Sequence, residues 1–567
     1  MPKSIYIFAV TISLALSPFL LQAQQADWTG RSQQNMVASV NPLATDAGVA
    51  AFEQGGNAVD AAIATALTLG VVDGFNSGIG GGCFILIRTA DGSLHAIDGR
   101  EMAPAAASRD MYLRDGKPDG SLSTVGPLAS GVPGALAAYA KAVQAHGKLQ
   151  LSQLVTPAAE IAENGFTVDT VYENKLKSIA KHLNTFAGTK AVLLKPDGSM
   201  YKTGDELKQP GLAKTYRSIA AEGVEWFYRG PFAQQTGDWM KQNGGIMTSD
   251  DFANYKTVER QPLRTTYRDY ELIGFPPPSS GGVHVAQILN ILEPFDLAAI
   301  NKQNPAQLKH LVAEAMKLAF ADRAYWLGDP DYVNVPRGLI DKAYAKELGS
   351  RIDLERSIKV DSHGTPPGSD TEFFSKHTTH LCTADKAGNW VAITTTVNTP
   401  FGSKVIVPGL GVVMNNQMDD FSAAPGVPNA YGLVGSKNNA IAPGKRPLSS
   451  MSPTIVLKGD KPIMSVGAAG GPKIITQAVW GIINHLDLKM TVGEAIAAKR
   501  VHHQWAPDRL RVESSLPVEQ LEFLKGKGHQ IWKSHEVGVS QAISYDPETG
   551  QFEGAHDPRV PGKAAGQ

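Results

Sequence analysis

TTHLCTADKAGNWVAITTTVNTPFGSKVIVPGLGVVMNNQMDD, residues 378–420, places hydroxyl, amide and carboxylate side chains among apolar and β-branched residues. A turn centred on Ala387 and made by Asp385–Asn389 separates two runs, 378–384 and 390–396, that are typical of paired strands. An antiparallel hairpin with this turn sets Thr378 opposite Thr396. Facing side chains on one surface of a sheet lie within reach of a hydroxyl contact.

Side chains alternate across the second of these strands, because successive residues of a strand point to opposite faces. One face carries apolar residues with one threonine among them: Val391, Ile393, Thr395 and Val397. The other face is polar and carries Thr394, Thr396 and Asn398, with Thr378 joining them across the hairpin. The sequence therefore proposes a polar face with a candidate site. The same alternation equally fits an ordinary Thr-rich strand without chemistry.

The composition of the chain indicates a large folded protein. Its 567 residues are 43% hydrophobic and 19% charged, which is ample for a core and argues against disorder. The net charge is −1, so nothing in the charge balance indicates nucleic-acid binding. Length alone suggests roughly three or four domains, but no linker divides the chain cleanly.

The N-terminus has the features of a targeting segment. Lys3 supplies a positive charge, Ile5–Leu21 is mostly apolar, and Leu21-Gln22-Ala23 is a plausible cleavage site. This pattern predicts a cleaved secretory signal over residues 1–23 and an exported protein, periplasmic or extracellular. An uncleaved anchor is the alternative. No other segment is apolar for long enough to span a bilayer.

Metal, cofactor and cysteine chemistry find little support in the sequence. Two cysteines, Cys83 and Cys382, favour two buried free thiols over a disulfide. No histidine is placed by spacing to activate Cys382, which argues against a cysteine nucleophile. His377 and His380 do not complete a metal ligand set, so no metal is expected. No phosphate-loop or dinucleotide fingerprint is present, and no cofactor is expected.

Helical and hairpin patterns alternate along the rest of the chain. Helices are expected within 40–72, 134–165, 283–293 and 306–327, and hairpins at 84–98 and 454–466. Thr491 and Glu494 form a capping-box pattern. Residues 357–376 are polar and rich in Pro and Gly, and we expect them to be the least ordered interior segment. Residues 425–436, which contain Tyr431, read either as a flap over a pocket or as a plain surface connection.

A glycine pair precedes a helix near residue 472. The strand of the second hairpin ends in GAAGG, and Pro472 begins a helical pattern that runs to about Leu486. Backbone N–H groups at Gly470 and Gly471 would then be unpaired at a helix start, which suits an anion or oxyanion. A tight turn that needs glycine for steric reasons alone is the other interpretation.

Taken together, the motifs resemble those of the γ-glutamyltransferases (γ-glutamyltranspeptidase, glutathione hydrolase), members of the N-terminal nucleophile hydrolase superfamily. The matching segments span nearly the whole mature chain and keep their order and spacing. They are GGNAVDAA (55–62), GIGGG (78–82), GREMAP (99–104), TTH (378–380), NNQMDDFS (415–422), PLSSMSPT (447–454), the pair Gly470-Gly471 and HHQW (502–505).

The resemblance implies an α/β (α+β) fold, a four-layer αββα sandwich built jointly by two subunits. The chain would cut itself between His377 and Thr378, giving a large subunit (24–377) and a small, catalytic subunit (378–567). Cleavage frees the α-amine of Thr378, whose intrinsic pKa of about 7.7–8.0 lets it act as the base for its own hydroxyl. Leu381 and Cys382 depart from the aromatic and small polar residues that the resemblance leads us to expect after the threonine–histidine start.

The resemblance also assigns roles to individual residues. Thr378 would be nucleophile and base, Thr396 would hold and polarise it, and Gly470 and Gly471 would form the oxyanion hole. The γ-glutamyl group would be bound through its α-carboxylate by Arg100, Ser449 and Ser450, and through its α-ammonium by Asn398, Gln417 and Asp420. Tyr431 would belong to a lid over the glutamyl pocket.

Three functions remain open at this point. The resemblance favours γ-glutamyl transfer from glutathione and other γ-glutamyl amides to water, amino acids or dipeptides, through a γ-glutamyl-threonine ester. A sibling acylase that removes glutaryl groups from cephalosporins would not need Asp420, Asn398 and Gln417 for an ammonium. An uncleaved binding protein for γ-glutamyl compounds would show one band, not two, on a denaturing gel.

Overall fold

The structure, a computed structural model, describes residues 27–367, 379–422, 428–433, 435 and 437–567. His377 and Thr378 therefore lie outside the described residues, as do the predicted signal segment and part of the 425–436 loop.

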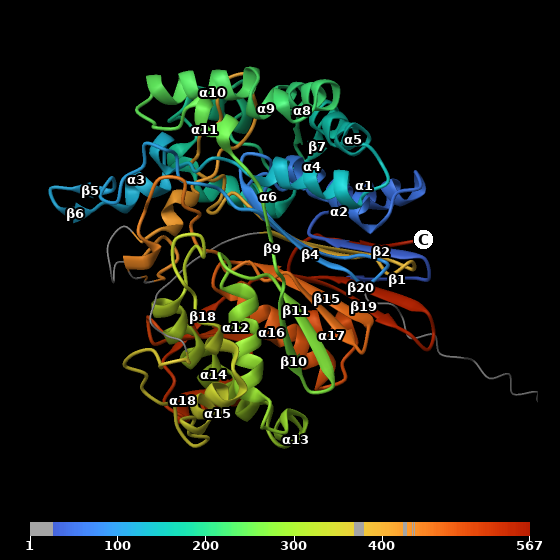
Figure 1. Cartoon of the computed structure of the whole chain (residues 1–567), viewed down its shortest axis with the longest axis vertical. Coiled ribbons are helices and arrows are strands. Elements are labelled where there is room, and N and C mark those ends of the chain that lie inside the picture. Colours follow the sequence, from blue (N-terminus) through green and yellow to red (C-terminus); the bar gives the residue numbers. More distant parts are fainter. Residues whose placement is uncertain (1–26, 368–378, 423–427, 434, 436) are drawn as a thin grey trace, which may run out of the picture.

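Two seven-stranded sheets form the centre of the molecule (Figure 1). The first sheet has the order β21 (Lys563–Ala565), β2 (Asn35–Ser39), β12 (Thr379–Asp385), β13 (Trp390–Thr396), β3 (Gly82–Arg88), β4 (Leu94–Gly99) and β9 (Val258–Arg260). The second has the order β1 (Thr29–Ser32), β20 (Gln551–His556), β19 (Val539–Asp546), β15 (Lys461–Ala469), β14 (Thr454–Lys458), β11 (Tyr270–Gly274) and β10 (Leu263–Tyr267).

Helices cover the outer face of each sheet. Above the first sheet in Figure 1 lie α1 (Pro42–Glu53), α2 (Ala58–Val72), α4 (Ala135–His146), α5 (Leu151–Asn164) and α8 (Pro210–Glu222). Below the second lie α12 (Gly281–Leu292), α14 (Pro305–Trp326), α16 (Lys473–Leu486) and α17 (Val492–Ala497). The expected four-layer αββα sandwich is confirmed.

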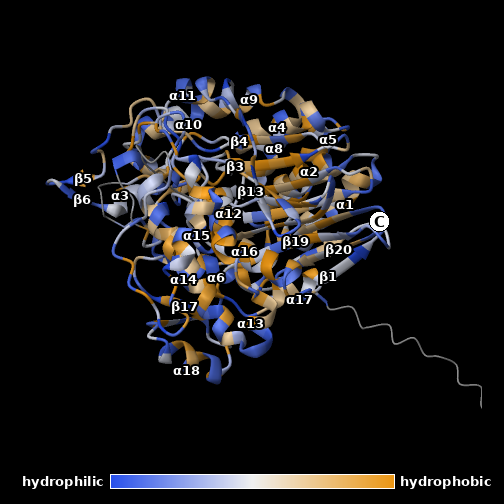
Figure 2. Cartoon of the chain, turned by 60° about the horizontal axis from the view of Figure 1, so that its bottom comes forward, coloured by the Kyte–Doolittle hydropathy of each residue, from blue (hydrophilic) through white to orange (hydrophobic). Residues whose placement is uncertain are grey.

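Three apolar clusters hold the layers together, one between the sheets and one beneath each helical layer. Figure 2 shows apolar residues concentrated along α2 and along α12 and α16, the helices that pack on the sheets. Every residue of α2 is buried. Asn57 caps this helix in a box with Asp60, so the GGNAVDAA motif fixes where the helix begins.

The predicted central hairpin is confirmed, with its register. Thr379 faces Thr395 and Ala384 faces Trp390, and the Asp385 N–H donates to the carbonyl oxygen of Asn389 across the turn. The Asp385 carboxylate in turn accepts from the Ala58 N–H at the start of α2. The turn of the hairpin is thus anchored to the helix above it.

Most other predicted elements are present. The capping box of Thr491 and Glu494 is present, and the helix after Gly471 ends at Leu486 as expected, although it begins at Lys473 with Pro472 as its cap. Within the described residues no single helix is long and apolar enough to cross a membrane. In the same part of the chain, the one pair of helices that meets those criteria together is α12 with α13 (Leu297–Gln303), and these two helices are bent by 70° relative to each other.

Candidate active site

The end of the central hairpin carries the polar groups that the sequence analysis singled out. The Thr396 hydroxyl accepts from the Asn398 N–H at 2.8 Å, and Asn398 Nδ2 donates to the carbonyl oxygen of Asn416 at 2.9 Å. Asn398 has a left-handed backbone (φ 77°), and its buried Oδ1 has no hydrogen-bond partner within the described part of the chain. An amide oxygen is therefore available to a donor at the strand end.

A glycine-rich turn, residues 78–82, packs closely against this strand end. A β-carbon on Gly81 would lie 1.7 Å from the carbonyl oxygen of Thr396, and one on Gly80 would lie 2.1 Å from that of Val413. Only glycine permits backbones to approach so closely. The GIGGG motif thereby fixes the position of the Thr396 backbone at the end of β13.

A buried carboxyl group lies beside the residue that follows the predicted nucleophile. Thr379 Oγ1 donates to Asp73 Oδ2 at 3.0 Å, and Asn76 Nδ2 donates to Asp73 Oδ1 at 3.0 Å. Burial raises the pKa of Asp73 to about 7, against the opposing effect of these hydrogen bonds. Sequence analysis missed Asp73, which lies at the C-terminal end of α2 and lines a cavity described below.

Arg100 and Asp420 form an ion pair although 320 positions separate them. Arg100 Nη2 lies 2.6 Å from Asp420 Oδ2, and both side chains are fully buried. Arg100 also donates to the carbonyl oxygens of Pro447 and Leu448, which lie just before Ser449. The guanidinium group is held rigidly, with its position set by backbone oxygens of a different segment.

Further predicted binding residues surround this pair. Gln417 Nε2 donates to Asp420 Oδ2 at 2.6 Å, and Asn429 Nδ2 lies 3.5 Å from Asp420 Oδ1. The Tyr431 hydroxyl donates to the carbonyl oxygen of Asn398 at 3.0 Å, so the loop carrying Tyr431 joins the Asp420 group to the strand end. This contact agrees with a flap over the site better than with a free surface connection.

Ser449 and Ser450 are fully buried in the same region, and they lead to a residue that sequence analysis missed. Arg323 of α14 donates from Nη2 to Ser450 Oγ and from Nε to Ser280 Oγ, both at 3.2 Å. Burial lowers the pKa of Arg323 to about 9, against the attraction of Asp420. No signal in the sequence marks Arg323, because it lies within a long helical pattern.

A second missed residue, Glu101, adjoins Arg100. Glu101 Oε2 lies 3.5 Å from Arg100 Nη1, and burial raises the pKa of Glu101 to about 8. The GREMAP motif thus places a guanidinium group and a weakly acidic carboxyl group side by side.

The predicted oxyanion glycines lie where β15 meets α16. Gly470 and Gly471 have φ values of 124° and 73°, which disfavour other residues. Both line a cavity of about 1250 Å³, together with Asn398 and Tyr431. Arg100, Asp420, Gln417, Ser449 and Ser450 are buried and do not themselves line this cavity. Asp420 is connected to it through Asn429, which lies two residues before the lining residue Tyr431.

The structure corrects the expectation about Cys382. His380 lies on the same strand face, and its Nε2 is 3.0 Å from Cys382 Sγ, so a histidine is placed beside this thiol after all. The strand period of two puts residues 380 and 382 side by side. Burial raises the pKa of Cys382 to about 12 and lowers that of His380 to about 3, so the pair stays neutral. Cys83 and Cys382 are both free and buried, as expected.

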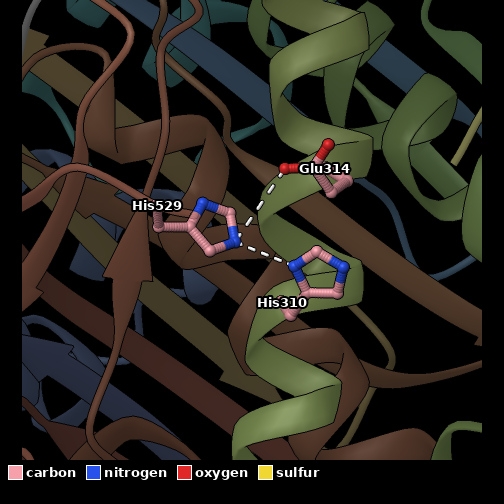
Figure 3. A group of neighbouring side chains, drawn as sticks. All are labelled: His310, Glu314 and His529. Carbon is pink, nitrogen blue, oxygen red and sulfur yellow. Dashed lines mark hydrogen bonds and ion pairs between the residues drawn. The ribbon is translucent and has the colours of Figure 1, made fainter. Parts of the chain in front are cut away.

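A separate polar cluster joins His310 and Glu314 of α14 to His529 (Figure 3). His310 Nδ1 is 2.8 Å from His529 Nε2, which lies 3.9 Å from Glu314 Oε1. Glu314 also accepts from Ser357 Oγ, and the Lys317 ammonium lies 3.0 Å from it. A cation at this distance opposes metal binding, so we interpret the cluster as a hydrogen-bonded junction. It ties residues 357–358 to α14 and to His529.

The paired sheets, their helical layers and the glycine-flanked strand end together define an N-terminal nucleophile hydrolase. Residues 44–567 match the model of the family described as Gamma-glutamyltranspeptidase, and the chain belongs to this family.

Individual relatives agree with this assignment. The chain is 45% identical to the glutathione hydrolase proenzyme of Escherichia coli over 532 residues, covering 93% of this chain and 91% of that protein. The structure of a cephalosporin acylase from Bacillus halodurans superposes with a TM-score of 0.85 at 29% identity, covering 98% of this chain and 99% of that one. The γ-glutamyltranspeptidase of Helicobacter pylori superposes with a TM-score of 0.54 at 39% identity, covering 59% and 94% of the respective chains.

Proposed function

We propose that this protein transfers the γ-glutamyl group of glutathione and other γ-glutamyl amides to water, or to the amine of an amino acid or dipeptide. The observation that carries the proposal is the buried pair of Arg100 and Asp420 beside a cavity lined by Gly470 and Gly471. An α-amino-acid head group carries one negative and one positive charge. Arg100 and Asp420 offer the complementary charges from two rigid positions.

Arg100 and the serines recognise the carboxylate end of this head group. A guanidinium fork matches a carboxylate geometrically, and the Ser449 and Ser450 hydroxyls add donors. Asp420 accepts from the ammonium, with the amide oxygens of Asn398 and Gln417 as further acceptors. The γ-carbonyl of the substrate then extends from this buried group toward the cavity.

The chemistry needs a nucleophile, a base and an oxyanion site. Thr378, released by cleavage after His377, would supply the first two, because its α-amine accepts the proton from its own hydroxyl. The hydroxyl oxygen attacks the γ-carbonyl, the Gly470 and Gly471 N–H groups stabilise the oxyanion, and the leaving amine takes the proton. Water or an acceptor amine then attacks the ester, regenerates the hydroxyl and releases glutamate or a new γ-glutamyl amide.

Three further points belong to the same proposal. The precursor divides into a large subunit, 24–377, and a small subunit, 378–567, which remain paired. Residues 1–23 direct export, so the enzyme works in the periplasm or outside the cell. The structural resemblance to a cephalosporin acylase gives the removal of glutaryl groups as an alternative function. The presence of Asp420 argues against it, because a glutaryl group has no ammonium for this carboxylate to bind.

Turnover of a chromogenic γ-glutamyl anilide, with and without a dipeptide acceptor, tests the proposal. We expect anilide release in water and faster release with the dipeptide. A matched glutaryl anilide separates the two functions. Preferred turnover of the glutaryl compound would favour the acylase, and turnover of neither would overturn the proposal.

A further inference from the structure

The cavity beside Gly470 and Gly471 has a wall that the γ-glutamyl group does not use. This wall is formed by the first residue of α16, Lys473, and by β17 (Leu510–Glu513) and β18 (Ile531–Ser534), two parallel strands of a small separate sheet. Arg511 of β17 is directly in register with Trp532 of β18, and both line the cavity.

Arg511 presents a guanidinium group to this cavity. Its Cζ lies over the Trp532 ring, 3.8 Å from the ring centroid, so the indole supports the guanidinium group through a cation–π contact. Within the described residues no carboxylate forms an ion pair with Arg511, in contrast to Arg500 and Arg559, which bind Asp557. Partial burial lowers the pKa of Arg511, against the attraction of Glu536. A guanidinium group is also more weakly hydrated than an ammonium group, which suits it to binding a carboxylate.

Lys473 brings a second cation close to the predicted oxyanion site. A β-carbon on Gly470 would lie 3.5 Å from Lys473 Nζ. The same ammonium is 3.3 Å from Glu536 Oε1. Lys473, Glu536 and Arg511 together therefore carry a net charge of +1. The N-terminal end of α16 adds its partial positive charge to the same wall.

We propose that Arg511, supported by Lys473, binds the carboxylate of the amine component of the reaction: the C-terminal carboxylate of the peptide that leaves the donor, and that of an amino-acid or dipeptide acceptor. The proposal rests on the proposed function. The amine nitrogen of this component lies at the γ-carbonyl, beside Gly470 and Gly471. Two extended residues reach roughly 7 Å further, which lets a carboxylate contact the wall while its amine is at the reacting carbon.

The test compares substrates with and without this carboxylate. In Arg511→Gln we expect the KM for glutathione to rise roughly 10- to 100-fold, the range of one charged hydrogen bond, while kcat changes little. Hydrolysis of the neutral γ-glutamyl anilide should stay within about twofold of wild type. Lys473→Gln should act in the same direction. Lys533→Gln is the matched control, because Lys533 follows Trp532 on the opposite face of β18 and is exposed.

Wild-type protein gives a second readout that does not depend on how the variants fold. Glycylglycine should be a better acceptor than glycylglycinamide, and this preference should disappear in Arg511→Gln. Equal losses with glutathione and the anilide, or equal use of the two acceptors by wild type, would overturn the inference. A wild-type protein that turns over no γ-glutamyl anilide would instead overturn the proposed function, so the two failures are distinguishable.

Discussion

The guanidinium group of Arg100 and the carboxylate of Asp420 lie 2.6 Å apart, with both side chains fully buried. Each residue neutralises the other, so the protein holds two charges in its interior that would be very costly singly. The same two groups are those that we assign to the two charges of the substrate head group.

Asp420→Asn tests that assignment with little change of shape. We expect turnover of γ-glutamyl substrates to fall at least 100-fold, because the ammonium loses its counter-charge, while glutaryl analogues without the amine lose far less. The ratio of kcat/KM for matched γ-glutamyl and glutaryl anilides measures this. Equal losses on both would show that Asp420 does not recognise the ammonium.

The sequence predicts the parts of this site whose residues lie close together along the chain, and it does not predict contacts between residues far apart in the chain. The register of Thr379 with Thr395 follows from local alternation and one turn, and it was confirmed. The pairing of Arg100 with Asp420 has no local signature, because neither residue belongs to a periodic pattern that includes the other. Only the family resemblance, and not residue spacing, predicted that both residues belong to one binding site.

Other features escaped prediction for different physical reasons. Arg323 reaches Ser450 from inside a long helix whose period shows only that it is buried or exposed. Asp73 lies at a helix end, where an acidic residue is unremarkable, and only tertiary packing brings it to Thr379. The contact of His380 with Cys382, by contrast, follows from the strand period and was predictable.

Gly81→Ala should damage the site without removing a polar side chain. Its β-carbon would lie 1.7 Å from the Thr396 carbonyl oxygen, so β13 must shift. We expect a lower melting temperature and at least a tenfold loss of anilide turnover. Gly120→Ala is the control, because its β-carbon meets nothing within 4 Å. Unchanged activity and stability in Gly81→Ala would refute the role given to the GIGGG motif.

Asp73 should make folding stability depend on pH. Its pKa is raised from 3.8 to about 7, so the folded state keeps a proton that the unfolded state releases between these values. Stability should therefore fall as pH rises from about 4 to about 7, by an amount on the order of 4 kcal/mol for this group. Asp73→Asn should make the decline across that range smaller by this amount in denaturant titrations, while the decline due to Glu101, whose pKa is also raised, remains.

The exposed Asp46→Asn variant serves as the comparison for Asp73 and should keep the wild-type slope. An Asp73→Asn protein whose stability varies with pH as in wild type would mean that this carboxyl group is ionised in the folded state.

Cys382 should be chemically inert in the folded enzyme. Burial raises the pKa of its thiol to about 12, so almost no thiolate exists at neutral pH. We expect iodoacetamide to leave native activity unchanged and Cys382→Ser to retain at least half of it. Rapid inactivation by the reagent, with Cys382 labelled, would contradict this.

Intact-mass analysis of the purified protein, paired with an activity assay, tests the central claim most directly. The account predicts two separate polypeptides, the smaller of which begins at Thr378. For Thr378→Ala it predicts a single, inactive chain. An active preparation in which residues 377 and 378 are still linked would contradict it.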